Sequence, residues 1–106
     1  MDLVGQLKKG TTRLAVLAAL ERGDGYGYGI RREVLHRTKG TFALNEGALY
    51  PVLHTLQRKG LVRRRIESVK GRERRYYALT AKGRRELDSA RRQWQYVRDS
   101  LNALLR

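Results

Sequence analysis

The C-terminal end of the chain predicts a helix that is long for a protein of 106 residues. Thr80 is a suitable N-cap, and the helix is expected from Ala81 to about Leu105, a span of roughly 37 Å. Apolar residues recur along it at alternating steps of three and four, the a/d pattern of a coiled coil. This seam consists of Leu87, Ala90, Trp94, Val97, Leu101 and Leu104. The pattern predicts that two copies of the chain pair through this helix as a homodimer.

The first eighty residues predict a mainly helical body. Thr11 or Thr12 is expected to cap a helix that contains the apolar run Leu14–Leu20, and Gly23–Gly25 is expected to end it. Because this helix is apolar nearly all round, it should lie at the centre of the core. A second, shorter helix is expected from Tyr28 to Thr38, with Ile30, Val34 and Leu35 facing inward. Lys39 and Gly40 follow it as a C-terminal stop.

A third helix is expected from the N-cap Asn45 to Lys59, with Gly60 as its stop. Its apolar stripe is formed by Leu49, Leu53 and Leu56, and the opposite face carries Gly47, Tyr50, His54 and Arg58. Pro51 conflicts with this interpretation, because a proline inside a helix costs about 3 kcal/mol. We still expect one slightly kinked helix, because the stripe crosses the proline without changing phase.

Two strands are expected next, Val62–Ser68 and Arg74–Leu79, joined by a hairpin turn at Lys70-Gly71. The hairpin tip is expected to carry Lys70, Arg72 and Arg74. The order of helix, helix, turn, helix, hairpin and long helix is the plan of a winged helix-turn-helix. The predicted fold is therefore mainly α with a two-stranded β wing. We expect a DNA-binding domain over residues 1–80 and a C-terminal dimerisation helix over 81–106.

Positive charge is concentrated in the segment that should form the end of the third helix and the wing. The chain has 24 Lys and Arg against 10 Asp and Glu, a net charge of +14. Residues 58–75 alone hold nine basic side chains and two acidic ones. Small proteins are sometimes basic throughout, but a concentrated patch favours a polyanionic partner. Since a helix fits the major groove of double-stranded DNA and the wing cations can reach phosphates, the predicted fold and the charge agree.

Other function classes find little support in the sequence. The longest apolar run has seven residues, far short of a membrane span, and the N-terminus lacks the pattern of a secretory signal. The absence of cysteine excludes thiolate metal sites and fits a reducing cytoplasm. His36 and His54 lie on different expected helices, acidic residues are few, and the glycines of Gly23–Gly29 lack a following Gly-Lys-Ser/Thr. We therefore expect no catalysis, no metal and no cofactor.

Several short blocks of the sequence match a known family. They are Gly27-Tyr28-Gly29-Ile30, Ala48-Leu49-Tyr50-Pro51-Val52-Leu53, Leu56 with Lys59-Gly60-Leu61-Val62, and Arg74-Arg75-Tyr76-Tyr77-Ala78-Leu79-Thr80 with Gly83. In these blocks the chain resembles the PadR-like family of bacterial transcriptional regulators, and the resemblance covers nearly the whole chain from about Gly10. One departure is Tyr26, where the family often has His. The resemblance implies tolerance of Pro51, a homodimer built on the last helix, and flat aromatic effectors bound between the two copies.

These observations lead to specific site predictions. The residues expected to contact DNA are Tyr28, Gly47, Ala48, Tyr50, His54, Arg58, Lys70, Arg72 and Arg74. Trp94 is expected in the dimer seam, either as core or, with its copy, as a stacking slot for an aromatic effector. Repression is favoured over activation, since 106 residues leave no room for a separate polymerase-recruiting domain. The alternatives are a basic RNA-binding or ribosome-associated module, and a winged helix that docks a protein partner.

Overall fold

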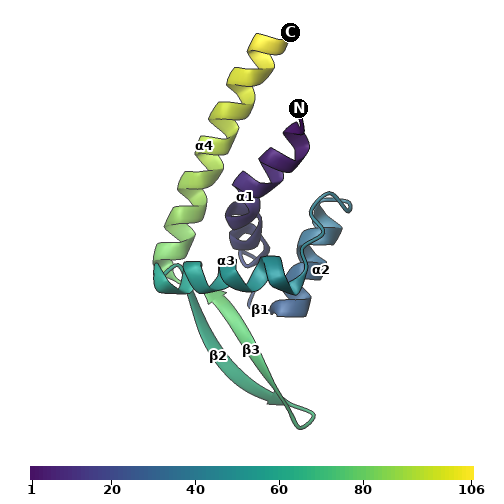
Figure 1. The fold of residues 1–106 in the computed structure, drawn as a ribbon. Helices are drawn as coiled ribbons and strands as arrows, with labels where there is room; N and C mark the ends of the chain where they lie inside the picture. The colour runs from purple at the N-terminus through teal and green to yellow at the C-terminus, as the bar shows by residue number, and fades with distance from the viewer.

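The computed structural model describes all of residues 1–106 as a helical body, a β wing and one long projecting helix (Figure 1). The elements in chain order are α1 (Leu3–Ala19), β1 (Gly25–Tyr26), α2 (Gly27–Arg37), α3 (Glu46–Arg58), β2 (Val62–Val69), β3 (Arg72–Leu79) and α4 (Ala81–Leu105). This is a winged helix-turn-helix with a long C-terminal helix, so the fold class expected from the sequence is confirmed.

The core lies where α1, α2 and α3 meet the base of the wing and the start of α4. Its thirteen buried residues are all apolar or aromatic: Val16, Leu17, Leu20, Ile30, Val34, Leu49, Leu53, Leu56, Leu61, Val62, Tyr77, Leu79 and Leu87. The whole stripe of α3 is in this set. The expected apolar run Leu14–Leu20 contributes Val16, Leu17 and Leu20, and its other four residues are partly buried against the core. Leu35, which the sequence placed inward, is exposed instead. The three helices and the base of the wing therefore share one core. The face of α3 opposite this core is exposed to solvent.

The start of α1 differs from the expectation. The helix begins at Leu3, where the Asp2 carboxylate accepts a hydrogen bond of 3.0 Å from the Gly5 amide. Thr11 and Thr12 lie inside the helix, and the Thr12 hydroxyl donates to the Lys8 carbonyl at 2.7 Å. A threonine whose hydroxyl bonds the carbonyl four residues earlier can lie inside a helix. The capping preference of threonine therefore predicted the wrong start for α1.

The ends of α2 and α3 follow the sequence closely. Asn45 caps α3 by accepting from the Ala48 amide at 2.8 Å, and Pro51 is accommodated within the helix as expected. Gly60 has a φ of +73°, and the Leu61 amide donates to the Leu56 carbonyl at 2.9 Å. This pair forms the αL stop expected of a glycine after a helix. α2 ends in the same way at Lys39 and Gly40, both with positive φ.

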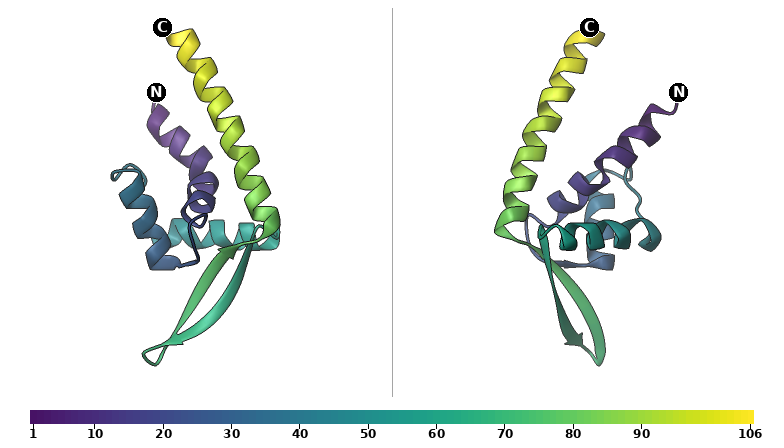
Figure 2. Two further views of the ribbon diagram at one scale, coloured as in Figure 1. Left: turned by 180° about the vertical axis from the view of Figure 1, so that it is seen from behind. Right: turned by 60° about the vertical axis from the view of Figure 1, so that its left-hand side comes forward.

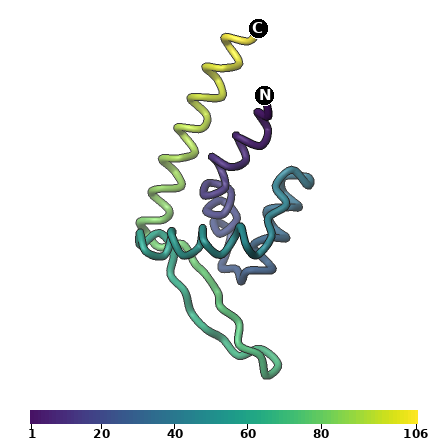
Figure 3. The backbone as a smooth tube through the Cα atoms, viewed as in Figure 1, coloured from purple at the N-terminus to yellow at the C-terminus, as the bar shows by residue number.

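The sheet has three strands rather than two, in the order β1-β3-β2. Figure 3 traces the two long segments of the wing, which leave the body and join at a tight turn. β2 and β3 are each eight residues long and pair from Val62 opposite Leu79 to Val69 opposite Arg72. The two residues between them, Lys70 and Gly71, have φ of +50° and +77°, as a two-residue hairpin turn with positive φ at both positions requires. β1 is only two residues long and pairs with β3, too short to leave a pattern in the sequence.

α4 begins at Thr80, whose hydroxyl accepts from the Gly83 amide at 3.0 Å, as expected. Figure 2 shows α4 and the first turns of α1 projecting from the body on the side opposite the wing. None of the helices is both long enough and apolar enough to cross a membrane. The chain therefore presents two separate working surfaces, one around α3 and the wing and the other along α1 and α4.

Candidate nucleic-acid interface

The face of α3 that points away from the core is open along its whole length. Gly47, Pro51, His54 and Arg58 follow one another at helical spacing and are all exposed, while the leucine stripe behind them is buried. An Arg58 guanidinium nitrogen donates to the Thr55 hydroxyl at 3.2 Å, which directs this cation along the helix surface. The N-terminal half of this face thus has short side chains, and the polar groups are concentrated at His54 and Arg58.

The first turn of α3 has one of its amides already satisfied. The Ala48 amide donates to the Asn45 side chain, so it is not free to bind a phosphate. What Ala48 offers to a ligand is its exposed methyl group, suited to apolar contact with a thymine methyl. Gly47 is also exposed and adds no side chain, which allows close approach to this end of the helix.

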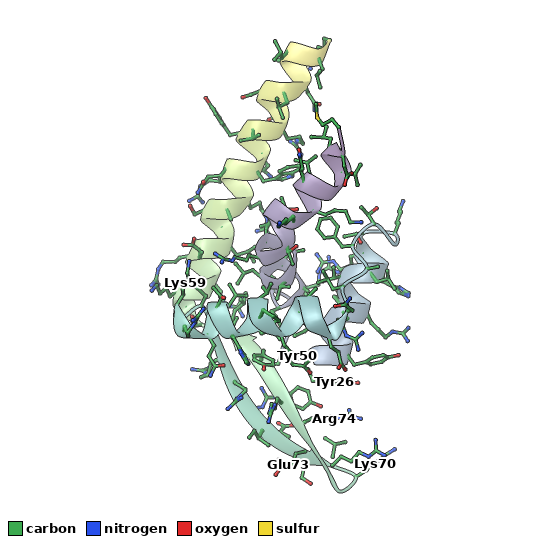
Figure 4. The ribbon with its side chains drawn as sticks, in the orientation of Figure 1. Tyr26, Tyr50, Lys59, Lys70, Glu73 and Arg74 are labelled. Atoms are coloured by element: carbon green, nitrogen blue, oxygen red, sulfur yellow. The ribbon has the colours of Figure 1, made fainter.

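Tyr50 lies on the flank of α3 and is half-buried against the core. Its hydroxyl occupies the position that a side chain on Gly27 would fill, so it packs against the start of α2. Figure 4 shows Tyr50 below α3, followed by Tyr26 and Arg74 along the wing and by Lys70 at the turn. Tyr50 therefore joins two helices of the motif, and a contact between Tyr50 and DNA stays a prediction.

Tyr28 lies in the first turn of α2 with two arginines around it. The side chain is exposed, and the Arg32 guanidinium donates to its hydroxyl at 3.2 Å. This hydrogen bond lowers the pKa of Tyr28. The guanidinium carbons of Arg31 and Arg32 are 5.7 and 5.8 Å from the ring centroid. Tyr28 was expected at this surface from the sequence. Arg31 and Arg32 were not, although helical spacing from Tyr28 places them beside it.

The register of the wing separates its cations onto two faces. Residues directly opposite each other share a face, and residues alternate along a strand. Val62, Tyr77 and Leu79 are on the face that packs into the core. The opposite face, which we call the arginine face, carries four arginines: Arg63, Arg65, Arg72 and Arg74. Arg64 lies on the face opposite these four, because it pairs with Tyr77.

Two arginines of this face are stacked on tyrosines at the wing root. Arg74 lies with its guanidinium 4.6 Å from the Tyr26 ring centroid, and Arg65 lies 5.0 Å from that of Tyr76. The two rings are themselves 5.5 Å apart. Arg74 is therefore not at the hairpin tip as expected. Its ring partner Tyr26 belongs to β1, the strand that the sequence did not reveal.

Nearly all of the positive charge in residues 58–75 is unneutralised. Of the nine basic side chains there, only Arg65 forms ion pairs, with Asp24 and Glu67. Lys70 in the turn and Arg72 beside it are exposed and free of acidic partners. These free cations are suited to phosphate contacts, which are sequence-independent.

The second working surface is apolar and follows α4. Leu87 is buried in the core of its own chain, so it lies in the core and not on the exposed seam where the sequence placed it. Ala90 is half-buried, and the rest of the seam from Trp94 to Leu104 is exposed. A matching patch on α1, not predicted from the sequence, consists of Leu3, Val4 and Leu7, which are also exposed. Their spacing places them on one helix face, which was the available signal.

An apolar pocket of about 400 Å³ lies between the two apolar patches. Trp94 lines it from α4, Val4, Leu7 and Leu14 line it from α1, and Phe42 closes it from the α2–α3 loop. Trp94 is 39% exposed, so the indole is partly covered by its own chain and partly open to solvent. The pocket is wide enough for a small flat molecule or for an apolar side chain of a partner.

Comparison with known protein families places most of the chain within one of them. Residues 16–89 match the transcriptional regulator PadR-like family. The transcriptional regulator YqjI of Escherichia coli is 30% identical over 94 residues. That alignment covers 89% of this chain and 44% of YqjI, so this chain spans less than half of that protein.

Solved structures of bacterial regulators superpose on nearly the whole chain. A PadR family transcriptional regulator from Eggerthella lenta is 28% identical, with a TM-score of 0.86 over 97% of this chain and 88% of that one. The PadR-like transcriptional regulator BC4206 from Bacillus cereus is also 28% identical, with a TM-score of 0.82 over 95% of this chain and 97% of that one. The agreement includes α4, because these shares leave no room to omit a helix of 25 residues.

Proposed function

The chain belongs to the PadR-like family of transcriptional regulators, and from this premise we propose that it binds double-stranded DNA sequence-specifically, as a homodimer, and represses transcription. The observation that carries the proposal is the open face of α3 together with the unpaired cations of the wing. A family of regulators, rather than of enzymes, is consistent with that surface.

DNA binding is supported by how the two parts of the surface differ. On α3, Ala48 and Pro51 present apolar contacts and His54 and Arg58 present hydrogen-bonding groups, which suits the reading of base edges in the major groove. Tyr28 and the wing cations Lys70 and Arg72 flank α3 and suit phosphate contacts. Arg74 takes part from the arginine face rather than from the tip.

Fluorescence anisotropy tests this proposal. The probes are a labelled duplex from the DNA upstream of the protein's own gene, a scrambled duplex of equal composition, and an RNA of the same sequence. We expect tight binding to the first duplex only, with a steep salt dependence. Equal weak binding to all three probes would refute sequence-specific recognition, and preference for the RNA would favour an RNA-binding module instead.

Dimerisation is supported by the apolar patches on α4 and α1. An exposed row from Trp94 to Leu104, next to Leu3, Val4 and Leu7, is larger than isolated surface leucines would explain. Pairing through it would relate two copies of α3 by twofold symmetry, and a palindromic operator with half-sites roughly 34 Å apart would follow.

Light scattering after size-exclusion chromatography measures the oligomeric state. The wild-type chain is expected at twice its mass of 12.3 kDa. Leu101→Asp places a charge within the seam and should shift the protein to the monomer. Tyr96→Asp is the matched control, because Tyr96 is exposed on the other side of α4 and should leave the dimer intact. A monomeric wild type, or a dimeric Leu101→Asp protein, would contradict this interface.

The apolar pocket beside Trp94 supports a finer proposal, that a small flat aromatic effector binds there. In a dimer, the exposed face of one indole would lie near its copy and form a stacking slot. Trp94 is the sole tryptophan, so its fluorescence reports directly on this pocket. Aromatic dyes that quench this fluorescence should also change DNA affinity. Unchanged fluorescence and unchanged affinity across a panel of flat aromatic compounds would exclude such a site.

Repression follows from these two surfaces when the operator overlaps a promoter, because a bound dimer then occludes RNA polymerase. Transcription in vitro from the gene's own promoter tests the sign of the effect. Transcript levels should fall as the protein is added, and a rise would assign activation instead.

A further inference from the structure

The short turn that joins α1 to β1 carries two of the chain's ten acidic residues, and each pairs with a different distant element. The Glu21 carboxylate binds Arg91 on α4 through two hydrogen bonds, of 2.6 and 3.2 Å. Three residues later, the Asp24 carboxylate pairs with Arg65 on β2. One turn therefore contacts both the helix expected to form the dimer and the wing expected to contact DNA.

The wing end of this connection is held from several sides. Arg65 donates one hydrogen bond from a terminal guanidinium nitrogen to Asp24 and another from its Nε to Glu67 at 2.9 Å. Its guanidinium also stacks on the Tyr76 ring. These hydrogen bonds, to Glu67 first and to Asp24 second, raise the pKa of Arg65. Asp24 immediately precedes β1, which pairs with β3 through Gly25 and Tyr77. Because Arg65 is engaged within the protein, it differs from the free wing cations such as Arg72.

The helix end is equally specific. Glu21 follows directly after the last turn of α1, and its amide still bonds the Ala18 carbonyl at 3.2 Å, so its backbone is tied to that helix. Arg91 meets it with a two-pronged contact and also lies 3.4 Å from Asp88. The Arg91 hydrogen bond lowers the pKa of Glu21. Arg91 lies one turn beyond Leu87, where α4 leaves the core, so this contact bears on the direction in which α4 projects.

We propose that Glu21 and Asp24 are positioning residues for DNA binding, which hold α4 and the wing in a fixed relation through one turn of the chain. The proposal rests on the DNA-binding function proposed above. Neither carboxylate touches DNA. Each acts through an arginine, so that the angle of the dimer helix and the angle of the wing depend on the same four residues.

The proposal makes a prediction opposite in sign to plain electrostatics. In a protein of net charge +14 that binds a polyanion, removal of any carboxylate should strengthen binding. If Asp24 and Glu21 position the wing and α4, then Asp24→Asn and Glu21→Gln should instead weaken binding, by about threefold to tenfold. The slope of log Kd against log salt should stay at its wild-type value, because no phosphate contact is lost.

Two neutralising substitutions serve as matched controls. Glu73 lies on the wing and Glu86 on α4, both exposed and neither in an ion pair. Glu73→Gln and Glu86→Gln should bind the operator duplex as tightly as the wild type, or more tightly. Asp24→Glu, which keeps the charge, should recover most of the affinity. Binding by Asp24→Asn and Glu21→Gln that is equal to, or tighter than, that of their controls would overturn the proposal.

A second measurement, without DNA, keeps the proposal separate from the proposed function. Hydrogen exchange of the wing amides over residues 62–79 should become faster in Asp24→Asn and remain at the wild-type rate in Glu73→Gln. If the wild type showed no preference for duplex DNA, the proposed function would fail while this comparison still tested the contact. Equal exchange in the two variants would show that Asp24 does not hold the wing.

Discussion

The join between the body and α4 depends on Gly83, and its substitution by alanine gives a sharp prediction. Gly83 is buried in the first turn of α4, and a Cβ atom there would overlap the carbonyl oxygen of Leu61. The same oxygen accepts the Thr80 amide at 3.1 Å. Alanine at this position must therefore push the start of α4, together with Thr80, away from Leu61, which both strains the packing and breaks that hydrogen bond.

The change in stability combines two costs and one gain. Overpacking costs about 1–3 kcal/mol, and the lost hydrogen bond costs about 0.5–1.5 kcal/mol. Replacing a helical glycine by alanine returns at most about 1 kcal/mol. The steric effects win, and a net loss of about 1–3 kcal/mol remains. For a domain of this size, that loss lowers Tm by roughly 5–20 °C.

Thermal unfolding followed by circular dichroism, at one protein concentration, measures the effect. Gly10→Ala is the matched control, because Gly10 lies inside α1 with nothing within 4 Å of its added Cβ. Gly10→Ala should raise Tm by a few degrees, since only the helix-propensity gain of about 0.5–1 kcal/mol applies. A Gly83→Ala protein that melts at or above the wild-type temperature would refute the reasoning.

Three further predictions concern the wing, the core and the α1–α4 contact. Lys70→Ala and Arg72→Ala should each lower the slope of log Kd against log salt by about 0.9, whereas Arg65→Ala should leave the slope unchanged. Equal slopes for all three variants would contradict the assignment of free and engaged cations. Leu53→Ala, at a fully buried position, should cost about 2–5 kcal/mol in urea unfolding, and a loss below 1 kcal/mol would argue against the described core. The pKa of Glu21 is lowered from its usual 4.5, so above that pH its ion pair with Arg91 should make the wild type more stable than Glu21→Gln. The Tm difference between the two proteins should vanish as the pH falls through the lowered pKa. A Tm difference that persists in strong acid would exclude the ion pair as its source.

The parts of the fold that the sequence predicted are those governed by local chemistry. The cap at Asn45, the stop at Gly60 and the positive-φ turn at Lys70-Gly71 each rest on residues within a few positions of one another. The phase of the α3 stripe was also sufficient to retain Pro51 within the helix. Such features can be predicted because the groups that form hydrogen bonds with the backbone lie close by in the sequence.

The parts that the sequence did not predict depend on contacts between distant segments. β1 exists because Gly25 and Tyr26 meet β3 some fifty residues later, and two residues carry no periodicity of their own. Leu87 fits the heptad seam by spacing, yet the body of its own chain covers it. Arg65 and Arg72 look alike in the sequence, but in the fold Asp24, Glu67 and the Tyr76 ring all contact Arg65, whereas Arg72 has no acidic partner.

Dimethyl sulfate protection of the operator duplex tests the central claim most directly, because it reports on guanine N7 atoms, which face the major groove. If two copies of α3 enter the major groove of one operator, protection should appear in two tracts about one helical turn apart, and His54→Ala should weaken both together. Tight binding that leaves the guanines of both half-sites fully reactive would contradict the account.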